Sequence, residues 1–209
     1  MHGQAGARAG PCRIRLPTPG DGLKIIHSMI LVEQKWPAMF ERFKHLFTAP
    51  DDSGADSAAP APFDYDDVIL LDAEDLAEQG ILEAYEQLHP QLRQYDAEPA
   101  DIVEEFDEDA ATYTVFADGR RYDIRGNGVE GDAWALATVA LFEIVNASLA
   151  GSDHGFYALY GGNDLAGIFL TDEQFQLARE SIARHTHWPW IPVNHAPDYG
   201  FPFDEEQAG

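Results

Sequence analysis

The chain has 209 residues, of which 37 are Asp or Glu and 13 are Lys or Arg, so its formal net charge is −24. Charge of this sign and size repels nucleic-acid phosphates and anionic lipid, and we expect neither a nucleic acid nor a membrane as partner. The single cysteine, Cys12, excludes an internal disulfide and fits a reducing compartment, which favours the cytoplasm of a bacterium.

The N-terminal part of the chain is predicted to contribute little to a core. Residues 1–28 are rich in Gly, Pro and Arg, which predicts a disordered leader, or an upstream extension if translation starts at Met29 rather than Met1. A secretory signal is a less favoured alternative, because polar residues interrupt the apolar run that follows. Residues 29–47 are predicted to form a short strand and a helix, and residues 48–62 a flexible linker of low complexity.

One α+β domain is predicted over residues 63–190. An apolar run at residues 68–71 predicts a strand that leads into an acidic helix beginning at Ala73, and Gly80 interrupts this helix. Beyond the glycine, one apolar face continues at helical spacing through Ile81, Tyr85, Leu88 and Leu92.

Two hairpins supply the clearest strand signals. The predicted strands are residues 102–106, 112–117, 120–125, 156–160 and 165–170. Asp118-Gly119 is a strong signal for a two-residue hairpin turn, and the glycine-rich stretch at residues 161–164 predicts the second turn.

The stretch at residues 131–151 predicts a long helix that is apolar on almost every side. Asp132 is placed to cap its first turn and Gly151 to end it. A helix without a polar face must be covered on several sides, so we expect it to lie deep in the domain. Thr171 is predicted to cap one further helix, which runs to about His185.

The predicted fold is α+β, with its elements in the order β-β-β-α-β-β-α after N-terminal helical segments. The simplest arrangement is one antiparallel sheet of about five strands, with both C-terminal helices on one face. Residues 191–209 are too rich in proline for a helix, and we predict an extended tail whose aromatic side chains lie across the body of the domain.

Three histidines near the C-terminus are the candidates for a metal site. His185 and His187 would point to the same side of an extended segment, and His195 would join them, with His154 or Asp153 as a further ligand, to form a zinc site. Such a site would suit a metal-assisted hydrolase. The alternative is that histidines at a helix C-terminus are favoured by the helix dipole alone.

Two glycine-rich patterns have structural explanations. In the loop GSDHG, Asp153 and His154 would suit an acid–base pair, but no nucleophile motif accompanies them, and a helix cap explains the glycines. Gly126, Gly128 and Gly131 match G-x-G-x-x-G, yet the strand before them belongs to a hairpin and no βαβ unit follows. We interpret this match as accidental and predict no cofactor.

The acidic segment at residues 96–109 holds eight carboxylates and no basic residue. On a strand, Glu104 shares a face with Phe106 and Glu105 shares one with Val103, so acids alternate with apolar anchors. This pattern predicts a partner-binding surface made by Val103, Glu104, Glu105, Phe106, Asp107, Glu108 and Asp109. The alternative is a solvated edge strand whose charges prevent edge-to-edge pairing.

Together these observations predict a non-enzymatic acidic binding protein of the bacterial cytoplasm. Its expected role is that of an immunity or inhibitor protein, which docks a basic protein partner such as a toxin. A metal-assisted hydrolase that uses the C-terminal histidines is the first alternative. A structural subunit of a larger assembly is the second, and the oligomeric state stays open.

Overall fold

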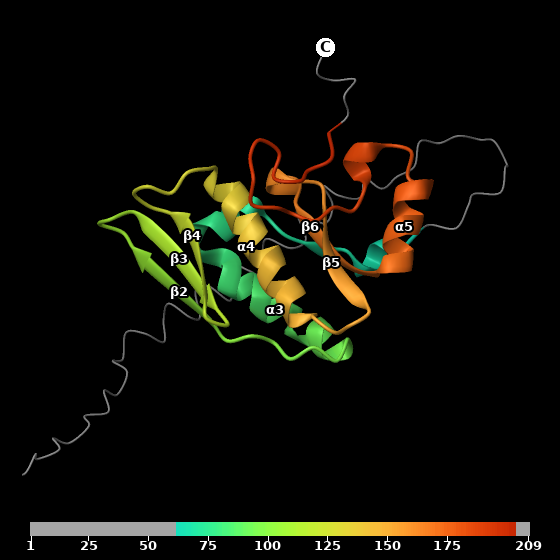
Figure 1. The fold of residues 1–209 in the computed structure, drawn as a ribbon, viewed down its shortest axis with the longest axis horizontal. Helices are drawn as coiled ribbons and strands as arrows, with labels where there is room; N and C mark the ends of the chain where they lie inside the picture. Colours follow the sequence, from blue (N-terminus) through green and yellow to red (C-terminus); the bar gives the residue numbers. More distant parts are fainter. Residues whose placement is uncertain (1–61, 204–209) are drawn as a thin grey trace, which may run out of the picture. The chain divides into compact units, whose positions relative to one another are not determined.

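A computed structural model describes residues 62–203 of the chain (Figure 1). The predictions for residues 1–61 and 204–209 lie outside the described residues. In chain order the elements are η1 (Tyr65–Asp67), β1 (Ile69–Leu70), α2 (Ala73–Asp75), η2 (Leu76–Gly80), α3 (Ile81–Gln94), β2 (Ile102–Asp107), β3 (Thr112–Ala117), β4 (Arg120–Arg125), α4 (Ala133–Ser148), β5 (His154–Leu159), η3 (Gly162–Asp164), β6 (Ala166–Thr171), α5 (Asp172–Ser181) and η4 (His185–His187).

The described strands form two antiparallel sheets of three strands each. One has the order β1-β6-β5 and the other the order β2-β3-β4. The α+β class with antiparallel strands is therefore confirmed, whereas two sheets replace the single sheet of about five strands that we expected. β1 pairs with β6, with Ile69 opposite Gly167, so the second hairpin belongs to a three-stranded sheet of its own.

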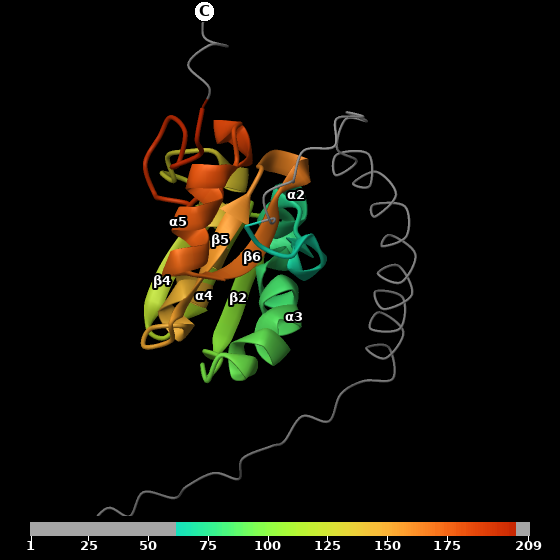
Figure 2. The same ribbon diagram turned by 90° about the vertical axis from the view of Figure 1, so that its right-hand side faces the viewer.

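Helix α4 lies between the two sheets, and α5 covers the opposite face of the β1-β6-β5 sheet (Figures 1 and 2). Along β5, Phe156 and Ala158 face the core around α4, while Tyr157 and Leu159 face a second cluster that includes Ala178 of α5. The prediction that both helices lie on one face is therefore wrong. Both faces of this sheet are apolar, so each face needs a cover.

Helix α4 is the buried centre of the domain, as its apolar sequence predicts. Phe142 and Val145 are both 0% exposed, and α3 packs beside the helix in addition to the two sheets. Asp132 caps the helix, since its Oδ1 accepts a hydrogen bond from the N–H of Trp134 at 3.4 Å. Neither α4 nor any other helix of the described residues has the length and apolar character needed to cross a membrane.

Two groups from outside the sheet close the outer edge of β5. The side-chain amide of Asn146 in α4 donates to the carbonyl of Phe156 at 2.9 Å and accepts from its N–H at 2.8 Å. The backbone of Trp190 exchanges both of its hydrogen bonds with Ala158, at 2.8 and 2.9 Å. Because residues two apart on a strand direct their backbone groups to the same edge, these four bonds satisfy that edge.

A kink separates α2 from α3, as the glycine in the sequence predicts. Gln79 has φ +76° and leaves the helical conformation. A side chain at Gly80 would place its Cβ 2.5 Å from the carbonyl oxygen of Asp75, so only glycine fits the kink.

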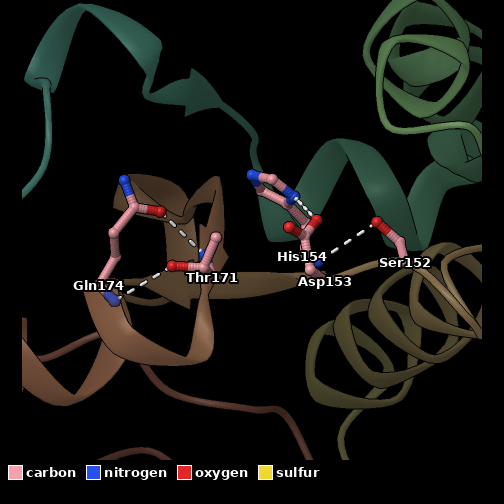
Figure 3. Close-up of polar contacts among 5 residues, drawn as sticks. All are labelled: Ser152, Asp153, His154, Thr171 and Gln174. Atoms are coloured by element: carbon pink, nitrogen blue, oxygen red, sulfur yellow. Dashed lines mark hydrogen bonds and ion pairs between the residues drawn. The ribbon is translucent and has the colours of Figure 1, made fainter.

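The hairpin turn and the helix cap that the local sequence predicts are both present. Asp118 and Gly119 have φ +48° and +76°, as a two-residue hairpin turn requires, and they connect β3 to β4. Thr171 Oγ1 accepts from the N–H of Gln174, whose Oε1 accepts from the N–H of Thr171, which is a reciprocal cap for α5 (Figure 3). Helix α5 ends at Ser181, earlier than we predicted, because the next residue adopts an extended backbone.

The described part of the tail turns back on itself instead of running extended as predicted. The N–H of Val193 donates to the carbonyl of Tyr199 at 2.8 Å, and the N–H of Tyr199 donates to the carbonyl of His195 at 3.1 Å. The aromatic rings still pack on the body, with Phe201 edge-on to Trp190 at a centroid distance of 5.3 Å.

Candidate functional site

The predicted partner-binding segment lies on β2, an outer strand of the β2-β3-β4 sheet. Its side chains alternate between two faces. Glu104 and Phe106 lie on the face toward α3 and the core, and Val103, Glu105 and Asp107 lie on the outer face. The structure therefore does not bring all seven predicted residues onto one surface.

Glu104 has a structural role that the sequence does not reveal. Its Oε1 accepts hydrogen bonds from the backbone N–H of Leu82, at 2.9 Å, and from the hydroxyl of Tyr113, at 2.5 Å. Helix α3 begins after Gly80, which has no side chain to cap it, so Glu104 acts as a cap supplied by β2. Burial of Tyr113, reinforced by its hydrogen bond to Glu104, raises the pKa of the Tyr113 hydroxyl.

Val103 is the apolar centre of the outer face. It is 56% exposed and pairs across the sheet with Phe116 of β3. On β4, the Arg121 guanidinium lies 5.9 Å from the ring centroid of Phe116 and 2.7 Å from a carboxylate oxygen of Asp123. The hydrogen bond from Arg121 lowers the pKa of the Asp123 carboxyl. Both charged groups face solvent, so the pair adds little stability and mainly fixes how the outer face presents its charges.

A hollow of about 540 Å³ lies on this outer face and extends to the loop after β4. The charged residues that line it are Glu105, Asp107, Asp123, Arg121 and Arg125, and the Arg125 guanidinium donates a hydrogen bond to the carbonyl of Ala77 at 3.3 Å. Arg121 pairs with Asp123 and also interacts electrostatically with Glu105, so three acids and two arginines leave the lining with an excess of one negative charge.

The turn from β2 to β3 holds the remaining predicted residues. Asp107 Oδ1 accepts a hydrogen bond from the N–H of Ala110 at 3.0 Å, which orders the turn. Glu108 and Asp109 at its tip are exposed. Phe106 is 37% exposed, and the Arg125 guanidinium lies 5.9 Å from its ring centroid, so part of the ring is already covered by a cation.

The whole described region is strongly acidic. Residues 62–203 contain 28 Asp and Glu, six Arg and no Lys. An excess of this size creates a negative potential around the molecule that attracts basic partners. The outer face of the β2-β3-β4 sheet combines this potential with an exposed apolar residue and a hollow.

The three C-terminal histidines make separate contacts. The ring of His185 lies 4.1 Å from that of Trp188, while His187 is edge-on to Tyr160 at 5.5 Å between centroids. His195 takes part in the tail turn through its backbone carbonyl. Within the described residues, no group of three or more His, Cys, Asp or Glu side chains is placed to hold a metal ion. The zinc-site hypothesis therefore has no supporting geometry in this part of the chain.

Asp153 and His154 do form a pair at the start of β5 (Figure 3). The Asp153 Oδ1 to His154 Nδ1 distance is 2.6 Å, and the imidazole stacks on the ring of Tyr95 with 4.0 Å between centroids. Ser152 Oγ accepts from the backbone N–H of His154 at 3.2 Å. The stacking and the hydrogen bonds position this pair as part of the turn between α4 and β5.

The match to a phosphate-binding glycine motif has no supporting architecture. The strand before Gly126 is β4, which pairs antiparallel with β3 in a hairpin, as we expected. A side chain at Gly131 would place its Cβ 2.7 Å from the hydroxyl of Tyr199, and its φ is +122°. Close packing against the tail therefore explains this glycine without a nucleotide.

Strands β3 and β4 contribute side chains to the outer face that we did not predict. Phe116, Arg121 and Asp123 lie beside Val103 and Glu105 because the hairpin turn fixes the register. This arrangement could have been predicted from the sequence, because a two-residue turn at Asp118-Gly119 determines which residues of β3 and β4 lie opposite each other.

Comparisons of the chain with protein families, with curated proteins and with solved structures find no match.

Proposed function

We propose that this protein is a non-enzymatic binding protein that docks a basic protein partner, in the manner of an immunity or inhibitor protein of the bacterial cytoplasm. One observation carries the proposal. The outer face of the β2-β3-β4 sheet presents exposed Val103 beside Glu105 and Asp107, next to a hollow of about 540 Å³.

The charge distribution supports a basic partner. A net negative field steers a cationic protein toward the surface, and this steering raises the association rate more than the final affinity. Glu105, Glu108 and Asp109 are exposed and are the acids we assign to recognition. Glu104 is excluded because it caps α3, and Asp107 serves both the turn and the hollow.

The apolar residues support a specific interface rather than charge attraction alone. Val103 is 56% exposed at the centre of the outer face, whereas Phe106 lies on the opposite face of β2 and is not part of this surface. Apolar side chains surrounded by charged residues resemble the centre and rim of a protein–protein interface. Truncation of such anchors acts mainly on the dissociation rate.

The competing explanation is that the acids only protect an edge strand. In the part of the chain that is described, no backbone group from another element bonds to the free edge of β2, in contrast to the closed edge of β5. Acidic side chains on such an edge discourage pairing between copies of the sheet. Edge protection requires only charge, whereas a docking face requires a partner at a defined position.

Site-specific photo-crosslinking in cells separates these explanations. A benzophenone amino acid replaces Glu105 in one variant and Leu177 in the control, since Leu177 is 48% exposed on α5. The proposal predicts that position 105, and not position 177, crosslinks to a protein rich in Lys and Arg. Crosslinking at both positions alike, or at 105 to a copy of this chain alone, would contradict it.

A further inference from the structure

A second hollow, of about 330 Å³, lies at the N-terminal end of α4 beside the folded-back tail. Four aromatic side chains and two carboxylates dominate its walls, namely Trp134, Trp190, Tyr199, Phe201, Asp132 and Asp198. None of the residues that line it is Lys, Arg or His. An aromatic pocket that contains acids and no base is chemically suited to an organic cation.

The pocket is built by contacts between segments far apart in the sequence. The indole Nε1 of Trp190 donates to the carbonyl of Tyr160 at 3.0 Å, which fixes one wall. The hydroxyl of Tyr199 accepts from the backbone N–H of Asp132 at 3.3 Å, which holds the tail against α4. Tyr199 has φ +51°, a conformation that non-glycine residues rarely adopt. Strain of this kind is commonly retained where it serves a site.

Both carboxylates retain the capacity to accept hydrogen bonds. Asp132 Oδ1 accepts from the N–H of Trp134 at 3.4 Å, and Asp198 Oδ1 accepts from the N–H of Gly200 at 3.2 Å. In each case the described hydrogen bond uses Oδ1 only, so Oδ2 can receive a donor from a ligand. The N-terminus of α4 contributes about half a positive charge, which two carboxylates outweigh. The pocket therefore favours cations over anions.

The surroundings indicate a side chain of a protein rather than a free small molecule. Trp134, Ile191 and Phe203 are 38%, 50% and 60% exposed, and the ring of Phe203 contacts that of Phe201 at 5.6 Å between centroids. Trp134 and Phe201 line the pocket, and Ile191 is next in the chain to Trp190, which also lines it. Exposed apolar residues close to a pocket mark a surface that a macromolecule covers. A volume of about 330 Å³ is at the small end for ligand sites and is sufficient for one long side chain.

We infer that this pocket receives the guanidinium of an arginine side chain presented by the basic partner. The inference rests on the proposed function and adds a contact site to it. Arginine suits the pocket better than lysine, because its planar, weakly hydrated group stacks on aromatic rings while it donates to carboxylates. Each component of the pocket then has a role, since the rings contact the guanidinium plane and Asp132 and Asp198 accept its N–H groups.

The test uses two small probes of nearly equal shape on the full chain, so it does not require the partner. Nα-acetyl-arginine methylamide carries the cation, and Nα-acetyl-citrulline methylamide replaces the guanidinium with a neutral urea. Binding is followed by NMR through the indole N–H signals of Trp134 and Trp190. We expect the arginine probe to bind at least about fivefold more tightly than the citrulline probe. A third probe, Nα-acetyl-lysine methylamide, tests the preference for arginine over lysine. Equal binding of the arginine and citrulline probes, no binding of the arginine probe, or tighter binding of the lysine probe would overturn the inference.

Variants locate the preference in the pocket. Asp132→Asn with Asp198→Asn removes both charges but keeps the capping oxygens, since Asn caps a helix as well as Asp does. The preference for arginine should disappear in this double variant. It should persist in Asp64→Asn, which neutralises a capping acid at η1, outside the pocket lining. A preference that survives the double variant would place the site elsewhere.

The double variant is first checked for the thermal unfolding transition of the parent. If it does not fold, Phe201→Leu replaces it and should reduce the preference by removing one ring. The outcomes also separate the two proposals. Failure of the arginine probe with an intact crosslink at position 105 would reject the pocket alone, whereas loss of the crosslink with normal probe binding would reject the docking face.

Discussion

Glu104 of β2 joins the β2-β3-β4 sheet to the start of helix α3. Its carboxylate accepts hydrogen bonds from the N–H of Leu82 and from the hydroxyl of fully buried Tyr113. Glu104→Ala should therefore lower the free energy of unfolding by about 2–4 kcal/mol, because two polar groups lose their acceptor. Urea unfolding measures the change. Glu105→Ala, on the outer face of the same strand, should stay within about 0.5 kcal/mol of the parent. Equal effects of the two variants would contradict the cap.

The buried tyrosines predict a specific sensitivity to alkaline pH. Burial, followed by repulsion from Tyr65, raises the pKa of Tyr160 from 10.0 to about 12. Above pH 10 the unfolded chain releases this proton while the folded chain retains it, so stability should fall as pH rises from 10 toward 12. Tyr160→Phe should make that fall shallower in urea unfolding at a series of pH values. An unchanged slope would mean that burial of this hydroxyl is not the cause.

At the scale of elements, the junction between α4 and β5 depends on Asn146. Its amide satisfies both backbone groups of Phe156 at the outer edge of β5. Asn146→Ala should lower the free energy of unfolding by about 2–4 kcal/mol, because it leaves these groups without partners in a half-buried place. Asn163→Ala, in the exposed turn of the second hairpin, is the matched control and should change stability little. The prediction fails if both variants unfold at the same urea concentration.

Helices and turns that depend on neighbouring residues could be predicted from the sequence, whereas the pairing of strands far apart in the chain could not. Asp118-Gly119 predicts its hairpin because a two-residue turn needs positive φ at both positions. The second hairpin forms a separate sheet in which Ile69 pairs with Gly167, and no local signal indicates this pairing. The burial of β5 on both faces could have been predicted from the sequence. Phe156–Leu159 is continuously apolar, which is typical of a strand buried on both faces.

In the candidate site, too, the local features could be predicted from the sequence and the long-range contacts could not. Alternation on β2 correctly separated the face of Val103 from that of Phe106. A single sequence does not distinguish an acid that points to solvent from one that caps a distant helix, so Glu104 was assigned to the wrong environment. The aromatic pocket depends on a tail that turns back through Val193 and Tyr199, and proline content alone does not predict such a turn.

For the whole molecule, the proposed docking has two steps, one that depends on charge and one that depends on shape. The 28 acids and six arginines of the described region give a field that acts before contact. In the proposed docking, the exposed apolar residues and the two hollows act only after contact. Salt should therefore weaken the first step and leave the second largely unchanged, since the Debye length is about 8 Å at physiological ionic strength. This division makes the docking proposal testable by kinetics.

The most direct measurement of the docking claim is the association rate with the protein crosslinked at position 105, at low and at physiological salt. Replacing Glu105, Glu108 and Asp109 by Gln, Gln and Asn should slow association at least ~10-fold at low salt and less at high salt. A control that replaces Glu86, Glu173 and Glu180 by Gln has the same net charge and should slow it far less, because those acids lie on α3 and α5. If the first variant associates as fast as the parent at both salt concentrations, the acids of β2 and its turn are not the docking site.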